Sequence, residues 1–328
     1  MCPTGECAPL YQARIVFSRY TSAIPSHRKG IDVEPESPLP VIPALRIAFG
    51  LFASGLIGLF AYWRGSLSRS GVSGAMIVGT LIFGFGGIAW GLLLITFFVT
   101  STLLSRFRRR EKERIAEEKF DKTDTRDIWQ ALANAGVAAL LAVIYWLNPE
   151  NWVMAAFIGA LATANADTWA TELGVLSKKP PHLITTGQVV EPGTSGGISA
   201  AGTLATAAGG LVIGVAMVIW FSLEQWVQAR GVDLRVVLAL SSWMIPAALL
   251  GGVAGSLFDS LLGATVQAIY YSPWRKKETE KRIDPNGQPN EFRRGLPWLN
   301  NDLVNLAATL TGAAAGAGVW ILIWQFLR

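Results

Sequence analysis

The amino-acid sequence predicts an all-α fold, a polytopic transmembrane helix bundle, and three observations carry this prediction. Of the 328 residues, 51% are hydrophobic and 16% are charged, whereas soluble domains carry about 25% charged residues. The charged residues are clustered, so the long apolar stretches between them are nearly free of charge. Thirteen tryptophans and 34 glycines also fit, because membrane helices tolerate glycine and place tryptophan at the interfaces.

About eight stretches are long and apolar enough to cross a bilayer, because a spanning helix needs about 20 residues. The expected helices are 43–63, two short helices within 72–104 that separate at glycines 84–87, then 128–147, 152–172, 197–221, 238–262 and 303–326. These stretches predict one integral membrane domain over residues 43–328. Residues 1–42 are polar and proline-rich, so we expect a disordered, dispensable tail there.

The polar connectors indicate how the bundle is oriented. Connectors after the first, third, fifth and seventh helices carry twenty Lys and Arg residues, and the others carry two, Arg230 and Arg235. The positive-inside rule then places the loops at about 105–127, 173–196 and 271–301 in the cytoplasm. We interpret the 105–127 connector as an amphipathic helix that faces solvent or headgroups. A multi-pass protein of the cytoplasmic membrane, if the organism is prokaryotic, with its site on the cytoplasmic face, is the expected localisation.

Composition and motifs exclude several classes of function. The net charge of +5 is modest and reflects loop topology and anionic lipids, not nucleic-acid binding. The only cysteines, Cys2 and Cys7, lie near the N-terminus, so neither a disulfide framework nor a zinc site is expected. The chain has no Gly-x-x-x-x-Gly-Lys-Ser/Thr motif, which excludes a P-loop.

Three acidic residues in or beside apolar helices, Asp167, Glu172 and Asp259, are candidate catalytic and metal-binding groups. A charged residue at the centre of a membrane helix costs roughly 2.5–3.5 kcal/mol, and carboxylate oxygens suit Mg²⁺. Five residues separate Asp167 from Glu172, which puts them about 140° apart around a helix. Either the helix ends between them, or each faces a different part of the site. The alternative is that Asp167 caps a broken helix and Glu172 is solvated.

A glycine-rich loop precedes the sixth expected helix and is a candidate phosphate site. Free backbone N–H groups and the helix dipole attract anions at such a position. The candidate phosphate-binding residues are Gly193, Thr194, Ser195, Gly196 and Gly197, together with Lys178, Asn301 and Asn305. The alternatives are a plain turn capped by Ser or Thr, an ordinary basic loop at Lys178, and helix capping by Asn300 or Asn301.

The sequence also contains a weak internal echo. Gly71-Val72-Ser73-Gly74 resembles Gly193-Thr194-Ser195-Gly196, and each run is followed by Gly-Thr-Leu and a Gly-Gly pair. The alignment requires one inserted residue. Both copies are expected to begin a helix from the same side of the membrane, which predicts a possible internal duplication.

Five blocks of the sequence resemble the signature segments of one membrane-protein family, which contains the animal transmembrane protein 19 and the chloroplast phytyl-phosphate kinases. The blocks are 166–174 (ADTWATELG), 183–186 (LITT), 192–197 (PGTSGG), 255–264 (GSLFDSLLGA) and 300–305 (NNDLVN). The similarity covers about residue 43 to the C-terminus, and the family is distantly similar to dolichol and phytol kinases. Residues 177–181 and the N-terminal tail fall outside these five blocks.

The resemblance implies an enzyme that phosphorylates an isoprenoid monophosphate to the diphosphate, with CTP as the expected nucleotide and Mg²⁺ as the expected cofactor. Asp167 would hold the metal, with Glu172 or Asp259, and the glycine loop would bind nucleotide phosphates. The expected partners are an isoprenoid lipid phosphate and membrane lipids. Two alternatives stay open: an ion-coupled transporter or flippase, since buried acids and broken helices also serve transport, and a lipid-phosphate cytidylyltransferase.

Overall fold

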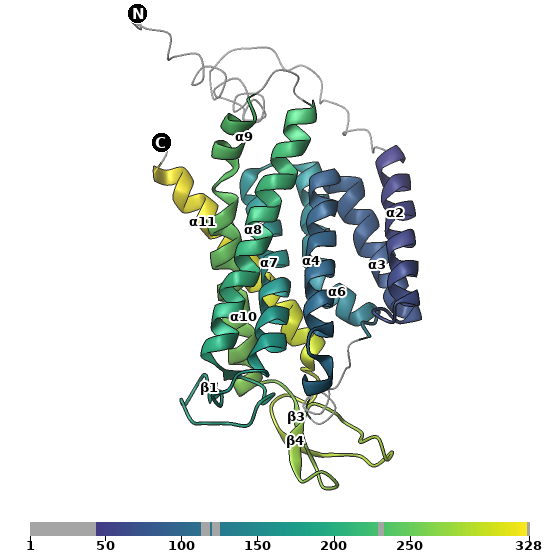
Figure 1. Ribbon diagram of the computed structural model, residues 1–328, viewed down its shortest axis with the longest axis vertical. Helices are drawn as coiled ribbons and strands as arrows, with labels where there is room; N and C mark the ends of the chain where they lie inside the picture. Colours follow the sequence, from purple (N-terminus) through teal and green to yellow (C-terminus); the bar gives the residue numbers. More distant parts are fainter. Residues whose placement is uncertain (1–43, 113–118, 120–124, 229–232, 327–328) are drawn as a thin grey trace, which may run out of the picture.

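The computed structural model describes residues 44–112, 119, 125–228 and 233–326 of the chain, and these residues form a bundle of long helices (Figure 1). The helices are α2 (Ala44–Trp63), α3 (Arg69–Leu81) with the π-helix η2 (Ile82–Gly86), α4 (Ile88–Arg106), α6 (Ile128–Leu147), α7 (Asn151–Gly174), α8 (Ala200–Gln228), α9 (Leu234–Ser241) with α10 (Met244–Thr265), and α11 (Asn301–Phe326). Seven helical segments in this part of the chain are long and apolar enough to cross a membrane. The predicted polytopic helical membrane protein is therefore confirmed.

Helix α7 is the centre of the bundle, although its polar residues keep it out of that set of seven. Every residue from Val153 to Ala166 is buried, and α7 packs against α4, α6, α8, α10 and α11. Small residues allow this approach, because a Cβ on Gly159 would lie 2.2 Å from the carbonyl oxygen of Gly312. The Thr163 hydroxyl donates a hydrogen bond to the Gly251 carbonyl over 3.0 Å. The site helix is thus held on all sides by close backbone contacts.

The expected break at glycines 84–87 is confirmed. The first of the two short helices ends in η2, and Gly87 separates it from α4 with a φ of +100°, a conformation that glycine adopts readily. The carboxylate of Glu224 on α8 then accepts a hydrogen bond of 3.2 Å from the backbone N–H of Ala89. A side chain from another helix therefore satisfies one of the free N–H groups at the start of α4.

Two predicted helix boundaries were wrong. The sixth helix begins at Ala200 rather than at residue 197, because Gly197–Ile198 form strand β2, which pairs with β1 (His182–Leu183). The seventh is interrupted after Ser241 and resumes as α10 at Met244. Pro246 explains this break, because a proline has no N–H to donate four residues back and its ring crowds that carbonyl, here the carbonyl of Ser242.

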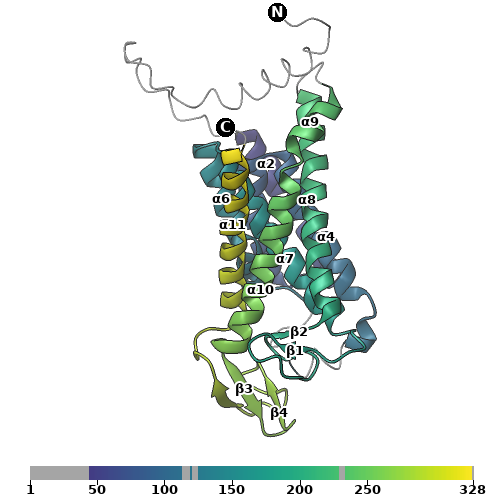
Figure 2. The same ribbon diagram turned by 90° about the vertical axis from the view of Figure 1, so that its left-hand side faces the viewer.

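The last expected polar loop contains an unpredicted three-stranded antiparallel sheet in the order β4-β3-β5. Its strands are β3 (Ile269–Ser272), β4 (Lys277–Thr279) and β5 (Glu291–Arg294). Strand β3 contains Ile and two Tyr residues, which favour strands. The sheet extends from the same end of the bundle as the β1–β2 hairpin (Figures 1 and 2).

The predicted grouping of the connectors is confirmed geometrically. The described parts of the connectors after α2, α4, α7 and α10 meet at one end of the bundle, whereas the start of α2 and the end of α11 lie at the other end (Figures 1 and 2). The expected tail 1–42, with Cys2 and Cys7, lies outside the described residues. Residues 113–118 and 120–124 of the expected amphipathic helix also lie outside the described residues.

Candidate functional site

A polar cavity of about 370 Å³ opens at the end of the bundle where these connectors meet. Its walls come from α4, α6, α7, α8, α10 and α11, from the glycine loop and from the segment after β4. The predicted site residues that line it are Asp167, Glu172, Gly193, Thr194, Ser195, Gly196, Gly197, Asp259, Asn301 and Asn305. Residues from four separate stretches of the sequence are therefore brought to one chamber.

Asp167 and Asp259 form an acidic wall of the cavity. Helices α7 and α10 pack side by side, and the Ser256 hydroxyl on α10 donates a 3.3 Å hydrogen bond to Oδ1 of Asp167. Asp259 lies one turn beyond Ser256 on α10, and its Oδ2 is buried without a hydrogen-bond partner. The carboxylate of Glu280, from the segment after β4, is close enough to act electrostatically on both aspartates. Such a wall is suited to a cation or to a ligand that carries one.

Glu172 faces a different part of the cavity, which is one of the two arrangements that its spacing from Asp167 allows. Helix α7 continues past it to Gly174. The Ser105 hydroxyl donates a 2.6 Å hydrogen bond to Oε1 of Glu172, and the Lys112 ammonium forms an ion pair with Oε2. Within the described residues, no three Asp, Glu, His or Cys side chains are gathered as a metal cluster. Glu172 is therefore engaged by Lys112 and is not grouped with Asp167 and Asp259, and the metal-binding role expected of Asp167 with Glu172 or Asp259 stays a prediction.

The glycine loop forms another wall of the cavity and lies against the end of α10. Gly196 has a φ of +82°, and a Cβ there would lie 2.4 Å from the Cβ of Ala264. The backbone N–H groups of Thr194 and Gly197 donate to carbonyls inside the loop, so the turn is internally held. The Ser195 hydroxyl donates a 2.8 Å hydrogen bond to Oε1 of Glu280. The loop and the acidic wall are thereby connected.

Two helix starts also lie at the cavity. Ser199 caps α8, because its Oγ accepts a 3.1 Å hydrogen bond from the N–H of Gly202, and Asn300 caps α11 through a 3.1 Å bond from the N–H of Leu303. Capping therefore explains Ser199 and Asn300. Asn301 and Asn305 lie within α11 and line the cavity, so their amides are available to a ligand by position.

The basic residues at the cavity come from a connector that the sequence reading assigned to solvent. Lys178 is exposed and is not part of the cavity wall, whereas Arg109, Lys112 and Arg126 line it. Lys112 is only 6% exposed, and its ammonium also donates to the carbonyls of Leu104 and Ser105 over 2.7 and 3.1 Å. The interpretation of this connector as a solvated face therefore fails at Lys112 and Lys119, which are buried, whereas residues 106–111 are exposed as expected. The chain turns back under α4 and satisfies the carbonyls at the end of that helix.

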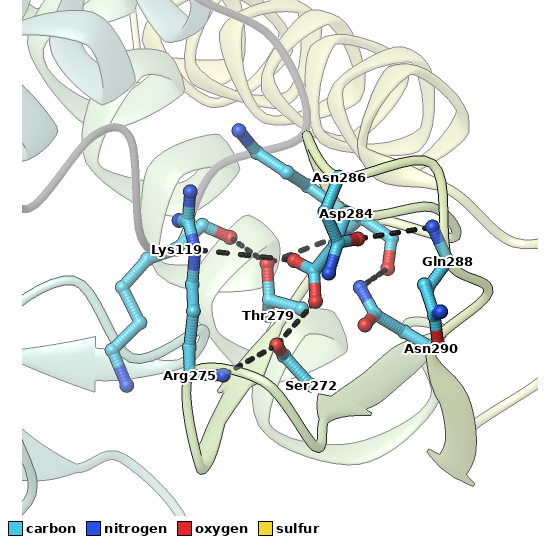
Figure 3. Close-up of polar contacts among 9 residues, drawn as sticks. Lys119, Ser272, Arg275, Thr279, Asp284, Asn286, Gln288 and Asn290 are labelled. Atoms are coloured by element: carbon cyan, nitrogen blue, oxygen red, sulfur yellow. Dashed lines mark hydrogen bonds and ion pairs between the residues drawn. The ribbon is translucent and has the colours of Figure 1, made fainter.

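The small sheet positions Glu280. The backbone carbonyl of Lys119 accepts hydrogen bonds from the N–H of Glu280, over 3.0 Å, and from the Thr279 hydroxyl, over 3.2 Å. Figure 3 shows this junction beside the hairpin, where the Ser272 hydroxyl donates to the carboxylate of Asp284. A residue of the connector thus fixes the end of β4, and Glu280 follows directly from it toward the cavity.

Lys119 also joins the connector to the glycine loop through an ion pair. Its ammonium lies 2.9 Å from Oε2 of Glu191, two residues before Gly193. The hydrogen bond and the positive charge of Lys119 hold the pKa of Glu191 below its ordinary value of 4.5. Lys119 therefore joins the connectors after α4, α7 and α10 around the cavity.

Several cavity residues were missed by the sequence reading. Gln130 and Asn134 are four residues apart on one face of α6, and Arg126 lies just before this helix begins at Ile128. That periodicity was a visible signal in a helix that is otherwise apolar. Glu280 gave no comparable signal, because it lies among charged residues of a polar loop.

Comparisons with known proteins give a consistent set of similarities. The family model described as integral membrane protein DUF92 matches residues 52–313. Protein PGR of Arabidopsis thaliana is 36% identical over 282 residues, which cover 82% of this chain and 94% of that protein. An uncharacterized membrane protein of Methanocaldococcus jannaschii is 33% identical over 77% of this chain and 86% of its own length. The protein VTE6, chloroplastic, of Arabidopsis thaliana is 27% identical over 80% of this chain and 66% of its own length. No solved structure matches the chain.

Proposed function

The chain belongs to the integral membrane protein family DUF92, and on this premise we propose that it is a membrane-embedded kinase for an isoprenoid monophosphate. It would transfer the γ-phosphoryl group of a nucleoside triphosphate, with CTP as the expected donor, to give the isoprenoid diphosphate. The resemblance of its sequence blocks to the phytyl-phosphate kinases suggests the reaction. The site was expected on the cytoplasmic face, and this sidedness is part of the proposal.

The observation that carries the proposal is the composition of the polar cavity. Asp167 and Asp259 on spanning helices, the glycine loop, Asn301 and Asn305 of α11 and three basic residues all line one chamber of about 370 Å³ at one end of the bundle. Phosphoryl transfer requires positioning and charge neutralisation more than covalent chemistry by the protein. A chamber with acidic, basic and amide walls meets that requirement.

The proposed reaction assigns a role to each wall. An oxygen of the lipid monophosphate attacks the γ-phosphorus, a new P–O bond forms, and the bond from the γ-phosphorus to the bridging oxygen breaks to release the nucleoside diphosphate. Arg109 and Arg126 would neutralise the phosphate charge, since guanidinium groups suit phosphate oxygens. The Gly193–Gly197 loop and Asn305 would orient the nucleotide phosphates. No proton has to be removed from a nucleophile that is already anionic.

A divalent cation fits the acidic wall. Mg²⁺ is usually held by one or two carboxylates together with substrate phosphates, so a preformed cluster of three acids is not required. Asp167 and Asp259 would be its protein ligands, and the buried, unpartnered Oδ2 of Asp259 is the atom that most needs one. When bound, the ion would offset the charge of the transferring phosphoryl group. Glu172 is better described as the partner of Lys112.

A transporter is less well supported than an enzyme by the packing of α7. Transport requires access from both ends, and the polar cavity is confined to the end that carries Asp167. Toward the opposite end, Val153, Phe157 and Leu161 are fully buried in the apolar core. A cytidylyltransferase would use the same groups but would release pyrophosphate, so the products distinguish it from the kinase.

The test is a direct assay of the purified protein in lipid nanodiscs. Phytyl or geranylgeranyl monophosphate is supplied with Mg²⁺ and with CTP labelled at the γ-phosphate, and the label is expected in the lipid diphosphate. The assay is repeated with ATP, GTP and UTP. Absence of a labelled lipid with every nucleotide would overturn the proposal, and cytidylyl transfer with release of labelled pyrophosphate would replace it with the transferase reading.

A matched pair of variants tests the assigned site. Asp167→Asn should lower turnover by roughly 10²–10³-fold, because it removes a charge that acts on the transferred group. Asp233→Asn makes the same chemical change at the N-cap of α9, where asparagine caps as well as aspartate. It should leave turnover unchanged. Equal activity of the two variants would remove Asp167 from the site.

A further inference from the structure

A second cavity, of about 90 Å³, lies within the bundle beside the polar one. It lies between α2, α3, η2, α4 and α6, and its walls include Ile57, Val78, Phe83, Leu94, Phe98 and Ala135. These walls are almost entirely apolar. Water gains few hydrogen bonds in such a space, since a buried water needs two to four polar partners. The chemistry of the walls favours a hydrocarbon as the occupant.

The two cavities share one boundary. Arg126, Gln130 and Asn134 line both of them. Gln130 and Asn134 lie on the same face of α6, and Arg126 lies just before this helix. The guanidinium of Arg126 lies over the rings of Phe97 and Phe98, at 5.9 and 5.6 Å from their centroids. A cation therefore lies where the polar chamber meets the apolar one, held by the aromatic faces. An amphiphile with an anionic head and an apolar chain matches this junction.

The backbone at the junction is fixed independently of the side chains. The N–H of Arg126 donates to the Ser66 carbonyl over 3.1 Å, and the Arg126 carbonyl accepts from the N–H of Ser68 over 3.0 Å. The segment before α6 is thereby held against the turn between α2 and α3. The boundary of the two cavities is thus a structured element and not a loose loop.

We propose that the apolar cavity between α2, α3, α4 and α6 binds the hydrocarbon chain of the lipid monophosphate, with Arg126 at the junction where the phosphate enters the polar cavity. This inference rests on the proposed function and identifies where the hydrocarbon chain of the substrate binds. On α4 the cavity wall extends from Leu94 to Phe98, which is about 6 Å along the helix. The cavity therefore takes the part of the isoprenoid chain nearest the phosphate, and the phosphate stays beside Asp167 and Asp259.

The first experiment locates the chain without any turnover. Geranylgeranyl monophosphate with a photoreactive diazirine on the isoprene unit nearest its phosphate is bound to the protein in nanodiscs, without nucleotide, and the labelled residues are mapped by mass spectrometry. We expect labels on residues of α3, α4 and α6 that face the apolar cavity. Labels confined to lipid-facing residues such as Leu204 of α8, which is 73% exposed, would overturn the inference.

The second experiment fills the cavity. Ala75→Leu on α3 and, separately, Ala135→Leu on α6 place added carbons in it from different walls, so one variant remains informative if the other does not fold. Each should lower labelling and raise the KM for geranylgeranyl monophosphate about tenfold, the scale on which hydrophobic pockets discriminate. The KM for dimethylallyl monophosphate should change less, because its short chain occupies less of the cavity.

A control variant shows whether the effects are specific to the apolar cavity, and the outcomes distinguish this inference from the proposed function. Ala48→Leu makes the same substitution on an exposed position of α2 and should alter neither labelling nor KM. An unchanged KM for the long chain in both filled variants would overturn the inference. Cavity labelling in a protein that transfers no phosphoryl group would count against the proposed function alone, since the chain would still be located.

Discussion

Two glycine-rich helix starts, at α3 and at α8, lie at the same end of the bundle and use glycine for different purposes. At the start of α3, a Cβ on Gly71 would lie 2.1 Å from the carbonyl oxygen of Arg126, and one on Gly74 would lie 2.8 Å from the Cβ of Ala131. These glycines let the start of α6 pack closely. At the start of α8, Gly196 and its neighbours border an open polar cavity.

The comparison teaches that a shared local pattern does not define a shared role. Both runs precede a helix and both carry small residues that admit a close neighbour. The neighbour of Gly71 is a backbone segment, so the space is filled by protein. The neighbour of Gly196 on one side is Ala264 of α10, and the other side of the loop lines the cavity. The internal duplication suggested by the two runs stays a prediction.

The largest effect is expected from Gly196→Ala, which breaks the α8 side of the comparison. A Cβ would lie 2.5 Å from the backbone nitrogen of Ala264, and the residue would hold a φ of +82°. Overpacking and backbone strain together should cost about 3 kcal/mol, and turnover should fall about tenfold as the loop moves, in keeping with the cost of misplaced groups. Thermal unfolding followed by tryptophan fluorescence measures the loss of stability, and the assay with γ-labelled CTP measures the loss of turnover.

Gly187→Ala is the matched control for that variant. Gly187 lies in the same connector with a φ of +69°, but nothing is within 4 Å of the position of an added Cβ. Only the strain of about 1 kcal/mol for a left-handed residue is then expected, with unchanged turnover. Equal losses in the two variants would show that close packing at Gly196 does not matter.

Gly71→Ala breaks the α3 side and should have the next largest effect. Its added Cβ meets the Arg126 carbonyl, and we expect a loss of about 2 kcal/mol because the start of α6 can shift to relieve the contact. Gly318→Ala on α11, where nothing lies within 4 Å, should instead be neutral or stabilising by up to about 1 kcal/mol, since alanine favours helix. A Gly71 variant as stable as this control would contradict the packing role.

Lys112→Met sharpens the comparison on the cavity side. It leaves the carboxylate of Glu172, whose side chain is 19% exposed, without its cation, and should cost about 2 kcal/mol, less than a fully buried pair would. Lys178→Met, at an exposed position outside the cavity, should stay within about 0.5 kcal/mol of the wild type. Thermal unfolding of both variants decides which lysine the site uses, and a larger loss at Lys178 would reverse the assignment.

The smallest effect concerns pH and the ion pair between Lys119 and Glu191. Because the folded pKa of Glu191 lies below its ordinary 4.5, its contribution is present above pH 4.5 and is lost as the pH falls through the folded value. Glu191 is 61% exposed, so solvent screening limits the effect to at most about 0.5 kcal/mol. Glu191→Gln should therefore lower the Tm slightly at about pH 7 and not at about pH 3. A larger deficit at acidic pH would contradict this sign.

Much of the fold could be predicted from residue types in order. Apolar stretches long enough to span a bilayer, the glycine break before α4 and the basic connectors depend on local composition, and each was confirmed by the structure. The three-stranded sheet was missed because its strands are short and polar and gain their order from pairing with segments far away in the sequence. The interruption before α10 had a local signal in Pro246, which removes a backbone donor.

The sequence by itself determined which residues had to be explained: acids in apolar helices, a glycine loop and asparagines at a helix start. Only the tertiary structure decided that Asp167 and Asp259 share a wall, that Glu172 belongs to Lys112, and that Glu280 joins them. The tertiary structure also showed that Lys178 does not line the cavity, whereas Lys112 and Arg126 do. The physical reason is that burial penalises any unpaired polar group, so a polar residue in an apolar helix is visible in the sequence as one that needs a partner. Which residue becomes that partner depends on which helices pack together.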